Sequence, residues 1–157
     1  MIDSAQANAF LSAGRIAVVG ASNEPKNFGR TIVQALTDHG IDAVAVHPRE
    51  ISVSGRPCYP DLASIPDAVD GVIVMVPKAS ALDVVRDCME HGIARVWLFK
   101  GAGPGAVSDE AVRFCNDHGV GVVAGACPLM FLEPVGGVHK LHRALRRMNG
   151  SLAKASA

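Results

Sequence analysis

Five short runs of apolar, mostly β-branched residues recur along the chain, separated by more polar segments. Within each run the apolar positions are nearly continuous rather than alternating, which is typical of strands buried on both faces of a sheet. Such strands occur in parallel sheets that helices cover on both sides. The runs are Arg15–Val19, Ala43–Val46, Gly71–Val76, Arg95–Phe99 and Val120–Val123. They predict a parallel sheet of about five strands.

The segments between these runs have the periodicity of amphipathic helices. Ile32 and Leu36 fall on one helical face, and Leu82, Val85 and Met89 share another. Ser108 is placed to cap a further helix, since two acidic residues follow it in the first turn. Strands and helices that alternate in this way are joined by right-handed crossovers. The pattern therefore predicts a single α/β domain with a doubly wound sheet.

Three predicted helices that precede strands end in the same two residues. The pairs are His39-Gly40, His91-Gly92 and His118-Gly119. Glycine adopts the left-handed conformation of a helix C-terminus at low cost, and a histidine there faces the negative end of the helix dipole. We therefore interpret these histidines as helix-terminal residues rather than metal ligands.

The remaining segments set the limits of the domain. A leading helix over 4–13 is predicted to pack outside the sheet, which assigns residues 1–14 to it and residues 15–137 to the sheet domain. The stretch 51–70 holds one glycine and three prolines, so it is predicted to be irregular, with a short helix at Asp61–Ile65. Residues 138–157 predict a basic helix, about Val138–Met148, and a frayed tail.

Composition excludes several classes of protein. The chain has 157 residues, of which 49% are hydrophobic, and its 15 basic residues balance 15 acidic ones. A net charge of zero and few aromatic residues disfavour a nucleic-acid-binding protein. The N-terminus lacks the pattern of a secretory signal, and no apolar run is long enough to span a membrane. The four cysteines form no C-x-x-C pair, which fits a reduced cytoplasmic protein.

In a doubly wound sheet the ligand crevice lies beyond the carboxyl ends of the strands. After the first strand a glycine permits a tight turn, a serine offers a hydroxyl, and two cations lie near the following helix. The N-terminal amides of that helix are suited to holding a phosphate. The candidate residues of this turn are Gly20, Ala21, Ser22, Asn23, Lys26 and Arg30.

The second strand ends in His47, Pro48 and Arg49, without the carboxylate that binds the ribose of NAD. The G-x-G-x-x-G pattern of dinucleotide sites is also absent. NAD is therefore disfavoured, whereas Arg49 is a candidate to meet a phosphate on the 2′ or 3′ position of an adenosine ribose. An ordinary solvated arginine is the alternative interpretation.

The later strand ends supply a second group of candidates. Pro77 follows the third strand and Lys78 stands where a phosphate could bind, while Lys100 and Gly101 begin a glycine-rich loop after the fourth. Cys127 follows the fifth strand, without a base evident beside it. Cys88 and Cys115 fall within helices and are interpreted as core, and Cys58 is placed in the irregular stretch without a role. The chain contains no metal-ligand, Walker A or G-x-S-x-G motif, so no catalytic residue is predicted.

Taken in order, these motifs resemble the small CoA-binding proteins of the Rossmann type, which are related to the N-terminal CoA domain of the succinyl-CoA synthetase α subunit. The resemblance spans about 15–128. The matching pieces are Ile16–Asn23, Val46-His47-Pro48, Tyr59–Leu62 with Ile65-Pro66, Val76-Pro77, Val96–Leu98 and Cys127-Pro128. The sequence departs from the family at His47, where asparagine is common, and at Phe99-Lys100, where glutamine is frequent.

The resemblance implies a cytoplasmic protein that holds CoA or acyl-CoA across the strand ends. By this resemblance Gly20, Ser22 and Asn23 line the pyrophosphate turn, and Lys26 and Arg30 lie near phosphate. His47, Pro48 and Arg49 then lie near the adenosine, while Val76, Pro77, Lys78, Lys100 and Gly101 border the pantetheine. Cys127 completes the candidate contacts. The phosphorylated histidine and ATP-grasp parts of succinyl-CoA synthetase lie in other domains, so ligase chemistry is not expected in this sequence.

Two alternatives remain open at this stage. One is an NADP-dependent oxidoreductase with Arg49 on the 2′-phosphate. The other is a nucleotide-sensing interaction protein whose basic C-terminal helix docks an acidic partner, although a helix that simply packs on the sheet is the plainer interpretation. The apolar stretch Leu129–Leu132 is a candidate surface for a homodimer.

Overall fold

A computed structural model describes residues 2–132 of the chain. In this range the helices are α1 (Ser4–Leu11), α2 (Phe28–Asp38), α3 (Ala81–Glu90) and α4 (Asp109–Asp117). The strands are β1 (Ile16–Val19), β2 (Ala43–Val46), β3 (Ser52–Val53), β4 (Arg56–Tyr59), β5 (Gly71–Val74), β6 (Arg95–Phe99) and β7 (Gly121–Ala126). Short 3₁₀ turns lie at Leu62–Ser64, Lys78–Ser80 and Pro128–Met130.

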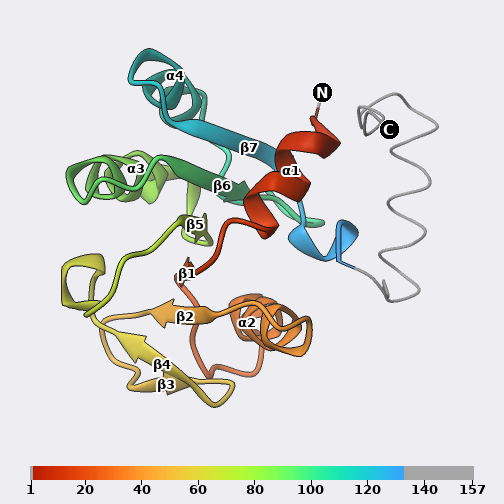
Figure 1. The fold of residues 1–157 in the computed structure, drawn as a ribbon, viewed down its shortest axis with the longest axis vertical. Helices are drawn as coiled ribbons and strands as arrows, with labels where there is room; N and C mark the ends of the chain where they lie inside the picture. Colours follow the sequence, from red (N-terminus) through yellow and green to blue (C-terminus); the bar gives the residue numbers. More distant parts are fainter. Residues whose placement is uncertain (1, 133–157) are drawn as a thin grey trace.

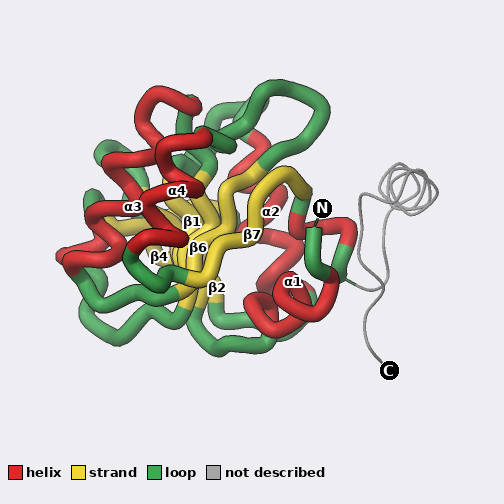
Figure 2. The backbone as a smooth tube through the Cα atoms, turned by 90° about the horizontal axis from the view of Figure 1, so that it is seen from above, coloured by secondary structure: helices red, strands yellow, loops and turns green. Residues whose placement is uncertain are grey.

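The seven strands form one sheet in the order β3-β4-β2-β1-β5-β6-β7. All neighbours are parallel except β3 and β4, which form an antiparallel pair at one edge. Helices α1 and α2 lie on one side of the sheet, and α3 and α4 lie on the other (Figures 1 and 2). The predicted single-domain, doubly wound α/β fold is confirmed.

Each face of the sheet carries its own apolar core. On the α1 and α2 side, the fully buried Trp97 lies between Phe10 and Phe131, with ring centroids 5.4 and 5.6 Å away. Its indole N–H donates to the carbonyl of Ala126 at 3.0 Å, so the polar atom of this large side chain is satisfied inside the core. On the α3 and α4 side, Val85 is buried against the opposite surface of the strands.

The stretch 51–70 corrects the sequence-based prediction. It was expected to be irregular, but it contains the β3–β4 hairpin before the short 3₁₀ turn at Leu62–Ser64. Ser54 and Gly55, the two turn residues, have φ angles of 49° and 74°, as a tight hairpin turn requires. Cys58 therefore lies buried in β4 rather than in a loop. The hairpin raises the strand count from about five to seven.

The predicted helix ends are confirmed. Gly40, Gly92 and Gly119 have φ angles of 73°, 72° and 69°. The Nδ1 atoms of His39, His91 and His118 lie 2.7 to 2.8 Å from the carbonyl oxygen four residues earlier. The serine cap of α4 is also present, since the Ser108 hydroxyl accepts a hydrogen bond from the N–H of Ala111.

Two other predictions concern the end of the described chain. The stretch Leu129–Leu132 was the candidate surface for a homodimer, and its residues Met130 and Leu132 are buried in the core on the α1 and α2 side. The predicted boundary at residue 137 and the basic helix Val138–Met148 lie outside the described residues. Within those residues, the helices are too short or too polar to cross a bilayer.

Candidate functional site

The strand order creates a switch point at the centre of the sheet. Strand β1 lies between β2 and β5. The chain passes from β1 to β2 through α2 on one face, whereas it passes from β5 to β6 through α3 on the other face (Figure 1). Because the two connections leave in opposite directions, their loops separate beyond the carboxyl ends of β1 and β5. A ligand crevice is expected at this place.

A cavity of about 240 Å³ lies at the switch point. It draws its walls from the ends of four strands and from one face of α3. The lining residues are Val19, Gly20, Val46, His47, Pro48, Pro60, Asp61, Leu62, Val76, Val84 and Asp87. Gly20, His47, Pro48 and Val76 were predicted from the sequence, and the structure brings these four together. Asp61, Val84 and Asp87 were not among the predicted site residues. Val84 and Asp87 lie within α3, and Asp61 follows β4, a strand that the sequence did not predict.

Gly20 fixes the geometry of the β1–α2 turn. Its φ angle is 98°, and a Cβ atom at this position would lie 2.4 Å from the carbonyl oxygen of Met75. Its N–H donates to the carbonyl of Val46 at 2.9 Å, and its own carbonyl accepts from the Asn27 side chain at 3.0 Å. Glycine is therefore required by the left-handed backbone and by the close approach of the residue after β5.

The start of α2 is capped by a residue that the sequence analysis missed. The Asn27 side-chain oxygen accepts a hydrogen bond from the N–H of Gly29 at 2.8 Å, while its amide group holds Gly20. An asparagine directly before a helical segment is the usual signal for such a cap. Ala21 and Ser22 are buried within the same turn, where the Ser22 hydroxyl accepts from the N–H of Glu24 at 3.3 Å.

Asn23 and Arg30 are engaged with protein atoms. The N–H and the side-chain amide of Asn23 donate to the two carboxylate oxygens of Glu50, at 3.0 and 2.9 Å. The amide also reaches the carbonyl of Ser52 in β3, and Arg30 donates to the Asn23 carbonyl at 3.2 Å. These bonds tie the turn to the β3–β4 hairpin. The backbone hydrogen bond from Asn23 lowers the pKa of Glu50 below its ordinary value.

The other predicted cations lie around the strand ends but outside the lining of this cavity. Lys26 and Lys100 are exposed in the loops after β1 and β6. The Arg49 side chain is exposed after β2, and its backbone N–H donates to Nδ1 of His47 at 3.2 Å. Their contacts with phosphate remain predictions.

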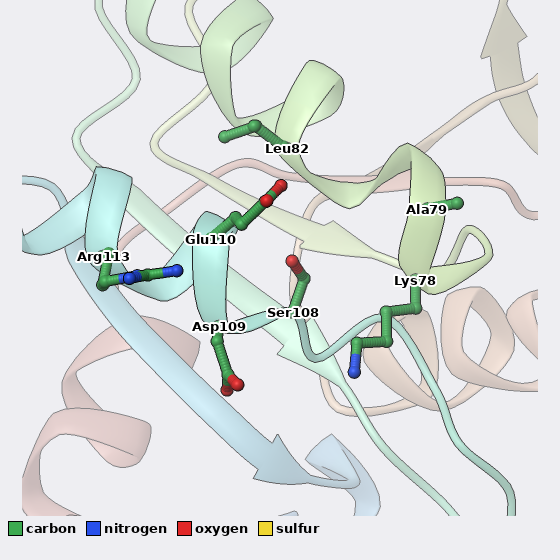
Figure 3. A pocket seen from close by; sticks show the side chains of 7 residues that line it. All are labelled: Lys78, Ala79, Leu82, Ser108, Asp109, Glu110 and Arg113. Atoms are coloured by element: carbon green, nitrogen blue, oxygen red, sulfur yellow. The ribbon is translucent and has the colours of Figure 1, made fainter.

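A second hollow, of about 590 Å³, lies between the N-terminal ends of α3 and α4. Figure 3 shows Lys78 and Arg113 on opposite sides of it, with the Ser108 hydroxyl between them. Its lining residues are Lys78, Ala79, Leu82, Ser108, Asp109, Glu110 and Arg113. The segment 76–78 therefore runs between the two cavities, because Val76 lines the first and Lys78 lines the second, with the exposed Pro77 between them.

The loop after β6 lies close to an aromatic pair. A Cβ atom on Gly101 would lie 3.1 Å from the Phe99 ring, and the Phe99 and Phe28 ring centroids are 5.7 Å apart. Cys127 is 2% exposed and directly precedes the 3₁₀ turn at Pro128–Met130. Its expected contact with a ligand remains a prediction.

The cysteines in the helices are confirmed as core residues. Cys88 and Cys115 are fully buried. Burial raises the pKa of Cys88 to about 12 and that of Cys115 to about 11. Since the thiolate is the reactive form, these two side chains are poor nucleophiles at neutral pH.

Comparison with known proteins identifies the family. The family described as "CoA binding domain" matches residues 14–133. The chain belongs to this family. The fold of a mostly parallel sheet with helices on both faces is the Rossmann-like fold expected from the sequence.

Several relatives carry the same domain. The chain is 30% identical over 126 residues to the α subunit of ADP-forming acetate–CoA ligase II from Pyrococcus furiosus, a match that covers 75% of this chain and 27% of the relative. It is 33% identical over 118 residues to ADP-forming acetate–CoA ligase I from Archaeoglobus fulgidus, covering 71% of this chain and 17% of the relative. The chain thus matches about a quarter or less of these ligases.

A solved structure shows the same architecture at similar size. A hypothetical protein from Pyrococcus horikoshii OT3 superposes with a TM-score of 0.73 and is 27% identical in sequence. The superposition covers 82% of this chain and 88% of that protein. The described domain therefore also occurs with little additional chain around it.

Proposed function

We propose that this domain binds CoA or an acyl-CoA across the carboxyl ends of β2, β1 and β5. The observation that carries the proposal is the cavity at the switch point, where Gly20, His47 and Val76 converge in a chain of the CoA-binding family. Ligands of open α/β sheets bind at such points.

The volume of the cavity indicates which part of CoA it holds and which parts lie outside it. A volume of about 240 Å³ is smaller than the roughly 300–1,000 Å³ of pockets that enclose a drug-sized ligand. The cavity therefore fits one part of CoA, and its mostly apolar walls suit the adenosine end. The pyrophosphate then meets the β1–α2 turn, whose path Gly20 fixes. Exposed Lys26 and Arg49 supply positive charge beside it.

The rest of the ligand has a path across the end of β5. The segment 76–78 connects the cavity to the second hollow, so the pantetheine can pass Val76 and Pro77 and reach Lys78. The exposed Lys100 and the adjacent Gly101 border this path from the loop after β6. We place the thiol or thioester end of the ligand beside the loop after β6, with Cys127 behind that loop.

We further propose that these residues hold CoA without transforming it. The thiols of Cys88 and Cys115 are buried with raised pKa values, and no histidine lining the cavity is paired with a described nucleophile. The ligases that the chain resembles are several times longer than the matched region. This supports a binding role for the matched part.

Calorimetric titration of the full chain with CoA, 3′-dephospho-CoA, NADPH and NADH tests the proposal. CoA is expected to bind and the two nicotinamide cofactors are not. Arg49→Gln should weaken the binding of CoA more than the binding of 3′-dephospho-CoA, because Arg49 is proposed to contact the ribose phosphate. Arg95→Gln is the matched control, since Arg95 is the first residue of β6 and lies at the amino ends of the parallel strands, away from the cavity. Binding of NADPH without CoA would instead favour an NADP-dependent oxidoreductase.

A further inference from the structure

The cavity at the switch point has apolar walls and a small number of polar groups. Val46, Leu62, Val76 and Val84 supply aliphatic surface from three strand ends and from α3. The ionisable side chains that line it are His47, Asp61 and Asp87. Mostly apolar walls with a few convergent polar groups are the usual arrangement of a site for a small molecule or cofactor.

The charge of these groups determines which part of a nucleotide fits. Hydrogen bonds from the Ser64 side chain and N–H, at 2.7 and 2.8 Å, lower the pKa of Asp61, so this carboxyl is ionised at neutral pH. Asp87 adds a second carboxylate to the lining. Two carboxylates disfavour a phosphate at this place because like charges repel. A neutral base is the part of CoA that the cavity accommodates.

Asp87 is held in place by its own helix. It follows Val84 by three residues on α3, so both side chains lie on the face toward the cavity. Nδ1 of His91 lies 3.1 Å from one Asp87 carboxylate oxygen and 2.8 Å from the Asp87 carbonyl. The contact orients the carboxylate and leaves further acceptor positions on it, because an ionised carboxylate offers about four lone-pair sites.

His47 supplies the complementary polarity. Its Nδ1 accepts a hydrogen bond from the N–H of Arg49 at 3.2 Å, which places the proton of the neutral ring on Nε2. Among the ionisable side chains that line the cavity, His47 can therefore donate a hydrogen bond, whereas the carboxylates of Asp61 and Asp87 accept. Adenine presents an amine donor at its 6 position and ring nitrogens that accept, whereas guanine presents an acceptor at the 6 position.

We infer that Asp87, with Asp61 beside it, selects adenine by accepting a hydrogen bond from the exocyclic amine of the base. This inference rests on the proposed function, since it assigns base selectivity to the cavity proposed for the adenosine end. A base with a carbonyl at the 6 position turns an acceptor toward these carboxylates and is rejected.

The test compares CoA with the analogue in which hypoxanthine replaces adenine. Calorimetry on the full chain should show CoA binding roughly tenfold more tightly, the order expected for one charge-assisted hydrogen bond in a partly exposed site. Asp87→Asn should reduce this preference to about threefold or less, because an amide can also donate to the carbonyl of hypoxanthine. Asp83→Asn is the matched control on the same helix, with a side chain that is 82% exposed, and it should keep the tenfold preference.

The outcomes separate the inference from the proposed function. Equal affinity of the wild-type protein for CoA and its hypoxanthine analogue would overturn the inference while leaving CoA binding intact. Retention of the tenfold preference by Asp87→Asn would also overturn it. If neither compound binds at millimolar concentration, the proposed function itself fails and the inference fails with it. The wild-type comparison decides the matter even if Asp87→Asn does not fold.

Discussion

Replacing Gly20 by alanine tests whether the β1–α2 turn is shaped by the residue that follows β5. Alanine must adopt the φ angle of 98°, which costs about 1–2 kcal/mol for a residue with a Cβ atom. The added methyl group also lies 2.4 Å from the Met75 carbonyl oxygen, so the backbone has to shift. Overpacking of this kind costs about 1–3 kcal/mol. Together the two terms predict a loss of about 2–5 kcal/mol in the free energy of unfolding.

Gly40→Ala is the matched control. Gly40 has a φ angle of 73° but no heavy atom within 4 Å of an added Cβ, so only the conformational cost of about 1–2 kcal/mol applies. Urea unfolding of both variants should give a difference of about 1–3 kcal/mol, or several degrees in Tm for a chain of this size. Gly20→Ala should also lose CoA affinity, whereas Gly40→Ala should retain it. Equal stability losses in the two variants would refute the steric argument at Gly20.

Two further predictions concern titratable side chains. The hydrogen bond from Asn23 lowers the pKa of Glu50, so the stabilisation that Glu50 provides is present above its ordinary pKa of 4.5 and is lost as the pH falls through the lower pKa of the folded state. The urea midpoints of the wild type and Glu50→Gln should therefore differ at neutral pH and converge in acid. A difference that stays constant with pH would contradict this. Cys88 and Cys115 have pKa values of about 12 and 11, so both thiols should resist a thiol reagent near pH 8 in the native protein and react fully in urea. Peptide mass spectrometry measures the labelling of each cysteine. Rapid labelling of either thiol in the native protein would contradict their burial.

The five strands that the sequence predicts could be recognised because each is a nearly continuous apolar run, and three of them closely follow a helix that ends in His-Gly. The edge hairpin could not, since β3 has two residues and β4 contains Pro57. In sequence these residues have the composition of a loop. Only the pairing of β4 with β2, and the turn at Ser54 and Gly55, makes them strands. The pairing depends on contacts between segments that local pattern does not reveal.

The candidate site was predicted to the extent that it lies at strand ends. Gly20 and His47 come directly after strands, Val76 lies two residues after β5, and all three meet in one cavity. Asp87 lines the cavity from the middle of α3, and the sequence does not distinguish it from the other polar residues of this helix. Glu50 follows β2 but turns toward Asn23, which depends on the path of the hairpin rather than on spacing. The residues that the sequence analysis missed therefore belong to the site because the tertiary fold brings them there.

Mapping the site of CoA by NMR tests the central claim most directly. Titration of the ¹⁵N-labelled protein with CoA should shift the backbone amides of residues 20–23, His47 and 76–78 in a saturable manner. Amides at the amino ends of the strands, such as those of Gly14 and Gly121, should not move. Saturable shifts confined to the amino ends of the strands, or no shifts with millimolar CoA, would contradict the assignment of the switch-point cavity as the CoA site.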